Sequence, residues 1–161
     1  MNRIQNLAAK IASQLVERGE TVSVAESSTG GLVSASLLAV PGASSYFVGG
    51  AVVYTASARN ALLGVELSDY PGVRAASEPY ALLLARTMRA RLGTTWALSE
   101  TGAAGPTGNR YGDAAGHTCV GVSGKLERAA TLETGLADRA RNMDLFALRA
   151  LEELEAALGS A

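Results

Sequence analysis

The sequence has little of what disulfide frameworks, metal centres and membrane spans require. It contains one cysteine and one histidine, too few for a disulfide framework or a Cys/His metal site, and its carboxylates are scattered along the chain. No apolar run reaches the about 18 residues of a membrane span, and the polar first three residues are unlike a secretory signal. We therefore expect a cytoplasmic protein with no metal, no cofactor and no membrane contact.

A surplus of positive charge is also missing. Lys and Arg total 14 against 15 Asp and Glu, a formal net charge of -1, whereas nucleic-acid surfaces work by counterion release from many cations. We expect no nucleic-acid partner. The 161 residues, 48% hydrophobic and 18% charged, fit a single domain over residues 1–161. Aromatic residues make up only 5% while glycine contributes 18 residues, so small residues serve backbone geometry here.

Hydrophobic periodicity and turn residues predict ten elements. In chain order they are helix 2–18, strand 21–25, helix 32–40, buried strand 46–54, helices 56–63 and 77–92, strand 94–99, strands 117–123 and 126–134, and helix 138–158. This order predicts a three-layer α/β/α sandwich with a mixed sheet and an antiparallel hairpin near its end. The apolar, Gly-rich segment 46–53 suits either burial within one chain or a homodimer surface.

Ligands in such folds gather at the carboxyl ends of strands. Three polar segments fall there: 26–31, 54–59 and the long Gly-rich segment 100–116, which we expect to be a loop. The first places hydroxyls and glycine amides at the start of a helix, an arrangement that favours an anion or a developing oxyanion. Alternatively, Ser28 or Thr29 only caps the helix and the glycines only allow close packing.

The other two segments also have a functional and a plain interpretation. Thr101–Pro106 is typical of a backbone nest for a phosphate or a carbonyl, or of a flexible surface loop. Tyr54 and Arg59 lie five residues apart and either face one cleft or are a boundary aromatic and a solvated charge. A Ser-His-Asp triad is not expected, because His117 lies far along the chain with no Asp placed to orient it.

Two arginines near the start of the last helix are unfavourably placed for its dipole. Arg139 and Arg141 would be explained by a ligand anion, or else by simple exposure. Cys119 lies in an apolar strand, where we expect a small buried side chain.

Taken together, four separated motifs resemble the CinA C-terminal domain family. They are Val24-Ala25-Glu26-Ser27-Ser28-Thr29-Gly30-Gly31, Val53-Tyr54 to Arg59, Leu63-Gly64-Val65 and Thr101-Gly102-Ala103-Ala104-Gly105-Pro106. The resemblance covers nearly the whole chain. It implies nicotinamide mononucleotide deamidase activity, in which the carboxamide is hydrolysed to give nicotinic acid mononucleotide and ammonia. In many bacteria this domain is fused to a larger N-terminal domain.

The resemblance also implies roles for individual residues. Ser27 would be the nucleophile, with Tyr54, Arg59 and Thr101 as further catalytic residues. Substrate-binding positions would be Ser28, Thr29, Gly30, Gly31, Gly102, Gly105 and Arg141, with Arg139 as the alternative to Arg141 for contact with phosphate. Ser28 stands where the family usually has cysteine, a near-isosteric exchange.

The second departure from the family pattern affects the chemistry. Arg59 stands where the family usually has a lysine that is thought to be the base partner of the serine. Arginine stays protonated in proteins and is a poor general base, and positioned base catalysis contributes typically about 10²–10⁴-fold. The only lysines, Lys10 and Lys125, are not obvious substitutes.

Two alternatives follow from this departure. The Arg59 guanidinium could favour the phenolate of Tyr54 as the base. The chain could instead be a weak or inactive paralogue that binds a pyridine nucleotide or a protein partner. A role in DNA uptake or damage, which the competence name of the family suggests, finds no support in the charge balance.

Overall fold

The computed structural model describes residues 2–161 and contains the ten predicted elements in the predicted order. The helices are α1 (Arg3–Arg18), α2 (Leu32–Leu38), α3 (Ala56–Leu63), α4 (Glu78–Leu92) and α5 (Arg139–Ser160). The strands are β1 (Val22–Glu26), β2 (Phe47–Val52), β3 (Trp96–Ala103), β4 (His117–Ser123) and β5 (Glu127–Glu133). Short 3₁₀ turns, Ala43–Ser45 and Leu67–Asp69, complete the secondary structure. None of the helices in residues 2–161 is both long and apolar enough to cross a bilayer.

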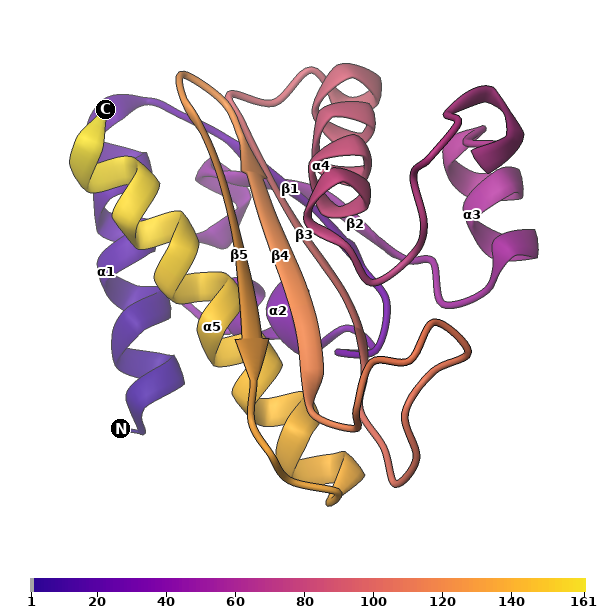
Figure 1. The fold of residues 1–161 in the computed structure, drawn as a ribbon. Coiled ribbons are helices and arrows are strands. Elements are labelled where there is room, and N and C mark those ends of the chain that lie inside the picture. The colour runs from indigo at the N-terminus through magenta and orange to yellow at the C-terminus, as the bar shows by residue number, and fades with distance from the viewer. Residues whose placement is uncertain (1) are drawn as a thin grey trace.

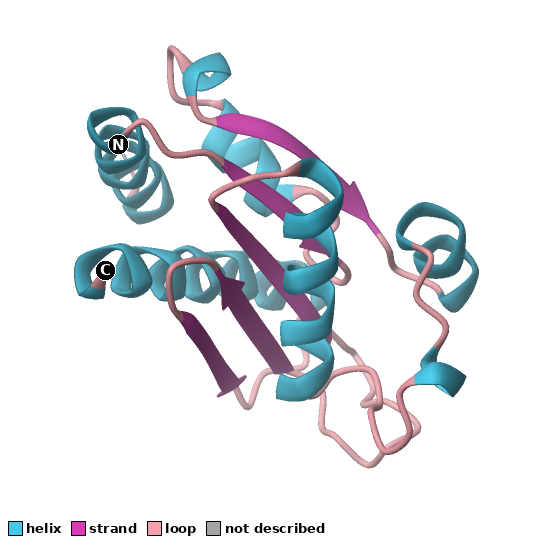
Figure 2. Ribbon diagram, turned by 90° about the horizontal axis from the view of Figure 1, so that it is seen from above, coloured by secondary structure: helices cyan, strands magenta, loops and turns pink. Residues whose placement is uncertain are grey.

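The five strands form one mixed sheet in the order β2-β1-β3-β4-β5. Strand β1 runs parallel to β2 and β3, and β3, β4 and β5 are antiparallel neighbours. Helices α1, α2 and α5 cover one face, and α4 covers the other with α3 beside it (Figures 1 and 2). The predicted three-layer α/β/α sandwich is confirmed.

Each face of the sheet has its own apolar core. Under α1, α2 and α5 the core includes Val22, Val24, Trp96 and Leu98. The core under α3 and α4 includes Ala25 and Ala97 from the same strands, together with Val53, Leu63, Val65, Tyr80 and Leu84. This alternation along β1 and β3 is the two-residue period of a strand. It sends successive residues at the ends of these strands toward opposite layers.

Helix α4 packs directly against the backbone of β4. A Cβ atom on Gly121 would lie 2.8 Å from the carbonyl carbon and oxygen of Ala81, so only glycine fits at this point of the strand. The same Ala81 carbonyl accepts a hydrogen bond from the Ser99 hydroxyl at 2.5 Å. These contacts fix the start of α4 over the carboxyl ends of the parallel strands.

Two predictions about strands were wrong. The sequence predicts a buried strand over 46–54, but β2 is an edge strand. Its residues alternate between partly buried and exposed. Val48 and Val52 face solvent, while Tyr46 is buried. Segment 100–116 was expected to be entirely loop, but β3 continues to Ala103 because all of Ala97–Ala103 pairs with β4. Glu100 is therefore a strand residue.

Candidate active site

Two carboxylates lie fully buried, one at the end of β1 and the other within β3. The side chains of Glu26 and Glu100 have no solvent exposure, and each is surrounded by hydrogen-bond donors from the segment 27–34 that follows β1. Burying an ionised group is costly unless it is fully bonded, so these two residues define how the chain turns from β1 into α2.

Glu26 accepts the free backbone N–H groups at the start of α2. Its Oε1 atom accepts from Gly31 at 3.1 Å and Val33 at 3.0 Å, and its Oε2 atom accepts from Ser34 at 2.8 Å. The Gly30 amide donates to the carbonyl of Ser27. The amides of Gly30 and Gly31, which were predicted to bind an anion, are thus hydrogen-bonded within the chain, and the protein's own carboxylate occupies the positive end of α2.

Glu100 holds the three residues that precede α2. Its Oε1 atom accepts the backbone N–H groups of Ser27 at 3.1 Å and Thr29 at 2.9 Å. Its Oε2 atom accepts the hydroxyl of Ser28 at 2.5 Å and the hydroxyl of Thr118 at 3.0 Å. Burial raises the pKa of Glu100, and the hydrogen bonds from these donors oppose that rise.

The hydroxyl of Thr29 bridges the two carboxylates. Its Oγ1 atom lies 2.6 Å from Glu26 Oε1 and 3.0 Å from Glu100 Oε1. A hydroxyl has one proton to donate, so both contacts become hydrogen bonds only if one carboxyl group carries a proton.

This arrangement distinguishes the two serines of the segment. Ser28 is buried, and its hydroxyl is engaged with Glu100. Ser27 is only half-buried, its backbone is fixed by Glu100, and its Oγ atom has no hydrogen-bond partner within residues 2–161. Ser27 thus combines a backbone held by Glu100 with a hydroxyl that carries no hydrogen bond within residues 2–161.

Tyr54 meets an arginine of α5 rather than Arg59. The Val53 amide donates to the Glu26 carbonyl at 2.7 Å, which places Tyr54 beside the end of β1. The Tyr54 hydroxyl accepts a hydrogen bond from Arg139 Nη2 at 3.0 Å, and Arg139 Nη1 donates to the Gly105 carbonyl at 2.6 Å. Arg139 therefore joins two of the three predicted site segments.

The contacts of Arg59 are with residues of α3, α4 and the segment after α3 rather than with Tyr54. Its side chain is buried under α4, with Cζ 5.9 Å from the centroid of the Tyr80 ring. Its Nε atom donates to the Val65 carbonyl at 3.0 Å and to Asn60 Oδ1 at 3.1 Å. The suggestion that Arg59 acts on the hydroxyl of Tyr54 is not supported by these contacts.

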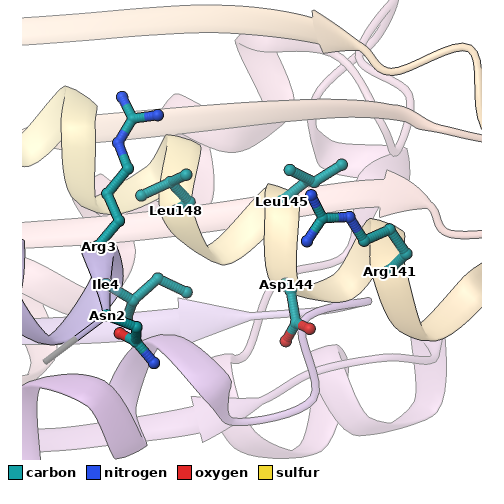
Figure 3. A pocket seen from close by; sticks show the side chains of 7 residues that line it. All are labelled: Asn2, Arg3, Ile4, Arg141, Asp144, Leu145 and Leu148. Carbon is teal, nitrogen blue, oxygen red and sulfur yellow. The ribbon is translucent and has the colours of Figure 1, made fainter.

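Arg141 points away from these segments. Together with Asn2, Arg3, Ile4, Asp144, Leu145 and Leu148, it lines a pocket of about 400 Å³ between the start of α1 and α5 (Figure 3). No residue of segments 26–31, 54–59 or 101–106 lines this pocket. Of the two arginines considered for phosphate contact, the structure places Arg139 with Tyr54 and Gly105, and Arg141 elsewhere.

The Thr101 hydroxyl is tied to the segment that starts α4. Its Oγ1 atom accepts the Ala76 N–H at 3.0 Å, and Ala76 has a positive φ of 57°. The carbonyl of Ala76 lies 2.7 Å from His117 Nε2. Next to Thr101, Gly102 allows β3 to approach β4, because a Cβ there would lie 2.6 Å from the His117 carbonyl oxygen.

Two acidic residues, which sequence reasoning did not place there, surround His117. Nδ1 lies 2.5 Å from Glu133 Oε1, and Nε2 lies 3.5 Å from Asp113 Oδ2 as well as near the Ala76 carbonyl. Asp113 is in turn bound by Arg74 at 2.8 Å. Since both ring nitrogens are engaged by these groups, His117 forms no triad with a serine. Cys119 is buried beside it, as predicted.

Stability should decrease as pH rises through the pKa of His117. Both ring nitrogens face acceptors, which requires both to donate. Burial alone would lower the pKa of His117, but the hydrogen bonds with Glu133 and the Ala76 carbonyl and the charges of Asp113 and Glu133 raise it above the ordinary 6.5. A histidine whose pKa is raised in the folded state stabilises that state fully below pH 6.5. This stabilisation is lost as the pH rises through the folded-state pKa.

Urea unfolding of the wild type and of His117→Asn across pH 5.5–9 measures this effect. We expect the free energy of unfolding to decrease with rising pH more steeply in the wild type than in the variant. Parallel pH profiles would show that His117 does not carry the proton.

Comparison with known proteins identifies the family. The sequence profile of the CinA C-terminal domain matches residues 4–158. The chain belongs to the CinA C-terminal domain family. A CinA-like protein from Salinibacter ruber is 40% identical over 147 residues, which cover 91% of this CinA domain and 36% of that protein. A CinA-like protein from Trichormus variabilis is 42% identical over 119 residues, which cover 74% of this chain and 29% of that protein.

Solved structures share the fold of this CinA domain. A competence-damaged protein (CinA) superfamily protein from Klebsiella pneumoniae has a TM-score of 0.92 at 22% identity, covering 99% of this chain and 100% of that one. The competence/damage inducible protein CihA from Agrobacterium tumefaciens has a TM-score of 0.90 at 29% identity, and the match covers 99% of this chain and 97% of that one. The chain spans about a third of the length of the curated relatives it matches.

Sequence reasoning missed the structural roles of Glu26, Glu100 and Arg139 in the CinA domain. A signal existed for Glu100, since an acidic residue directly follows the apolar run Trp96-Ala97-Leu98-Ser99 and a buried carboxylate must find donors. For a metal there is no such signal: residues 2–161 hold no group of three or more His, Cys, Asp and Glu placed to bind one.

Proposed function

We propose that this CinA domain is an amidase that hydrolyses the carboxamide of nicotinamide mononucleotide. The observation that carries the proposal is the half-buried Ser27 hydroxyl, which has no hydrogen bond within residues 2–161 while its backbone is fixed by Glu100. Membership of the CinA C-terminal domain family supports the choice of substrate. The Tyr54–Arg139 pair beside the same strand ends supports an anionic ligand.

The reaction proceeds in two steps at Ser27. Its Oγ atom attacks the carboxamide carbon, its proton passes to the departing nitrogen, and ammonia leaves as an ester forms. Water then attacks this ester, which releases nicotinic acid mononucleotide and returns the proton to Ser27. Because the Gly30 and Gly31 amides are already engaged, the charge on the carbonyl oxygen must be stabilised elsewhere, and the Arg139 guanidinium beside Tyr54 is the available cation.

Product formation from nicotinamide mononucleotide tests the proposal. We expect nicotinic acid mononucleotide and ammonia to form with the wild type, and turnover to decrease by about 10² or more in Ser27→Ala, because the nucleophile is lost. Ser28→Ala is the matched control: it removes a buried hydroxyl one residue away and should lower stability more than turnover. Equal rates in the wild type and Ser27→Ala would refute the proposal.

Tyr54→Phe is expected to lower turnover by about tenfold or more, because it removes the hydroxyl that accepts a hydrogen bond from Arg139, the cation proposed to stabilise the charge on the carbonyl oxygen. The Tyr54 side chain is 56% exposed, so the melting temperature should change little. Tyr70→Phe, another exposed tyrosine, is the control. Unchanged kcat and KM in Tyr54→Phe would exclude a role in the reaction.

One observation favours a second function, binding without efficient catalysis. Arg59 occupies the position where the family usually has its lysine base, and it is buried with its Nε atom fixed by Val65 and Asn60. Arginine is a poor general base in proteins. A protein that binds pyridine nucleotides with little turnover would show Ser27-independent affinity and negligible product.

A further inference from the structure

Glu26 and Glu100 form a buried pair of carboxyl groups without a cation. Both side chains have no solvent exposure, and a single atom, Thr29 Oγ1, lies within 3.0 Å of both. The other buried carboxylates of residues 2–161, Glu20 and Glu153, each form an ion pair with a lysine or an arginine. Two carboxyl groups that share a buried site titrate as a pair, and the second proton is lost only at a higher pH.

The hydroxyls around Glu100 have more acceptors than protons. Thr29 Oγ1 has one proton for Glu26 Oε1 at 2.6 Å and Glu100 Oε1 at 3.0 Å. Thr118 Oγ1 has one proton for Glu100 Oε2 at 3.0 Å and the Thr101 carbonyl at 3.1 Å. A hydroxyl donates a single hydrogen bond, so each of these places lacks one donor. A proton on the carboxyl pair supplies a donor exactly where two oxygens otherwise meet without one.

The sheet face that holds the pair is poor in charge. Glu26 and Glu100 follow Val24 and Leu98 by two residues, so they lie on the same face as these core residues, under α2 and α5. Segment 27–58, which includes α2 and β2, has no Asp, Glu, Lys, Arg or His. The repulsion between the two carboxyl groups is therefore not offset from this segment.

Ionisable groups of the other neighbouring elements are engaged elsewhere. At the start of α5, Asp138 accepts the Arg141 amide, and Arg139 donates to the Tyr54 hydroxyl and to the Gly105 carbonyl. In β4, His117 and Cys119 contact Ala76 on the opposite face of the sheet, while Thr118 between them contacts Glu100.

We propose that Glu26 and Glu100 share one proton across Thr29 at neutral pH, and that this proton-sharing pair positions Ser27. The Ser27 amide donates to Glu100 Oε1 at 3.1 Å, and the Ser28 hydroxyl donates to Oε2 at 2.5 Å. Burial raises the pKa of Glu100, the direction that a retained proton requires. When the proton leaves to solvent, the charge of the pair changes from one to two, and repulsion moves Glu100 together with the backbone that it holds. The positioning role rests on the proposed function of Ser27, whereas the shared proton does not.

Infrared spectroscopy of the wild type at pH 7 tests the shared proton. Exposed carboxyl groups ionise at about pH 4, so a carbonyl stretching band of a protonated carboxyl group at pH 7 belongs to a buried one. We expect this band in the wild type and its loss in both Glu26→Gln and Glu100→Gln, because either change leaves a single carboxylate. Thr29→Val removes a donor to the ionised pair and should raise the pH midpoint of the band by about one unit. Thr29→Ser, which keeps the hydroxyl, should retain the wild-type midpoint, and Thr87→Val, which removes a hydroxyl bound to Leu83 in α4, is the control.

The amide resonance of Ser27 tests the link to the nucleophile without substrate. In ¹⁵N-labelled wild type it should shift with the midpoint of the infrared band, and in Glu100→Gln it should not shift there. The Gly19 amide, which donates to Val16 at the end of α1, should not follow this midpoint in either protein. The kcat of nicotinamide mononucleotide hydrolysis should decrease by about tenfold or more above the same midpoint in the wild type, but not in Glu100→Gln.

The measurements separate this proposal from the proposed function. A wild type without the protonated band at pH 7, or a band that persists in both glutamine variants, overturns the shared proton. An unchanged midpoint in Thr29→Val overturns the role of Thr29. A Ser27 amide that does not follow the band overturns the positioning role. A wild type that forms no nicotinic acid mononucleotide refutes the proposed function, and the infrared and amide measurements then still decide whether the pair shares a proton and moves Ser27.

Discussion

Replacing Arg59 by lysine should raise the rate of nicotinamide mononucleotide hydrolysis by about 10²–10⁴-fold, the usual contribution of a positioned base. The side chain of residue 59 is buried beside Tyr80 and has no acidic partner among residues 2–161. Desolvation lowers the pKa of a lysine, so that its neutral form can accept the proton of a serine, whereas arginine stays protonated. Initial rates at saturating substrate measure the effect.

Two control variants accompany the measurement on Arg59→Lys. In Arg59→Lys with Ser27→Ala the gain should vanish, because a base without its nucleophile is of no use. Arg91→Lys, an exposed and distant change, should leave the rate unaltered. If Arg59→Lys is no faster than the wild type, a lysine at position 59 does not act as the base for Ser27. The site would then be adapted to binding rather than to amide hydrolysis.

Glu100→Ala should unfold the turn from β1 into α2. The substitution leaves the backbone N–H groups of Ser27 and Thr29 and two hydroxyls without their buried acceptor. An unsatisfied buried donor costs about 1–3 kcal/mol, so a loss of about 3 kcal/mol or more in the free energy of unfolding is expected from this set. Chemical denaturation measures it.

Glu100→Gln is the matched control, because it keeps the shape and one carbonyl oxygen for the two backbone donors. The pKa of Glu100 is raised by burial above 4.5, so the folded state holds the proton to higher pH than the unfolded state. Wild-type stability should therefore decrease relative to Glu100→Gln as pH rises from about 4.5 through the folded-state pKa. A wild-type free energy of unfolding that increases relative to that of Glu100→Gln over this pH range would contradict the raised pKa of Glu100.

The fold could be predicted from the sequence because each element has its own local signal. Helix α1, with its apolar stripe and the Gly19 stop, is found at Arg3–Arg18, and the hairpin of β4 and β5 turns where Gly124-Lys125 was expected. Strand order has no such local signal. The Val- and Gly-rich composition of β2 fits a buried strand, and only its place at the sheet edge shows that it is half exposed.

The sequence predicts which segments form the candidate site but not which of their side chains are in contact. Glu100 and Ser28 are 72 residues apart, so no spacing rule reveals their hydrogen bond. Arg139 and Arg141 are two residues apart on one helix, and such residues do not share a face. The structure shows Arg139 with Tyr54, and Arg141 in another pocket.

The central claim is that Ser27 is the nucleophile of an amidase whose rate is limited by arginine at position 59. Chromatographic assay of nicotinamide mononucleotide hydrolysis by the wild type, Ser27→Ala and Arg59→Lys tests it most directly. The account predicts slow formation of nicotinic acid mononucleotide by the wild type, none by Ser27→Ala and a large gain in Arg59→Lys. Equal product from all three proteins, or none from Arg59→Lys, would contradict it.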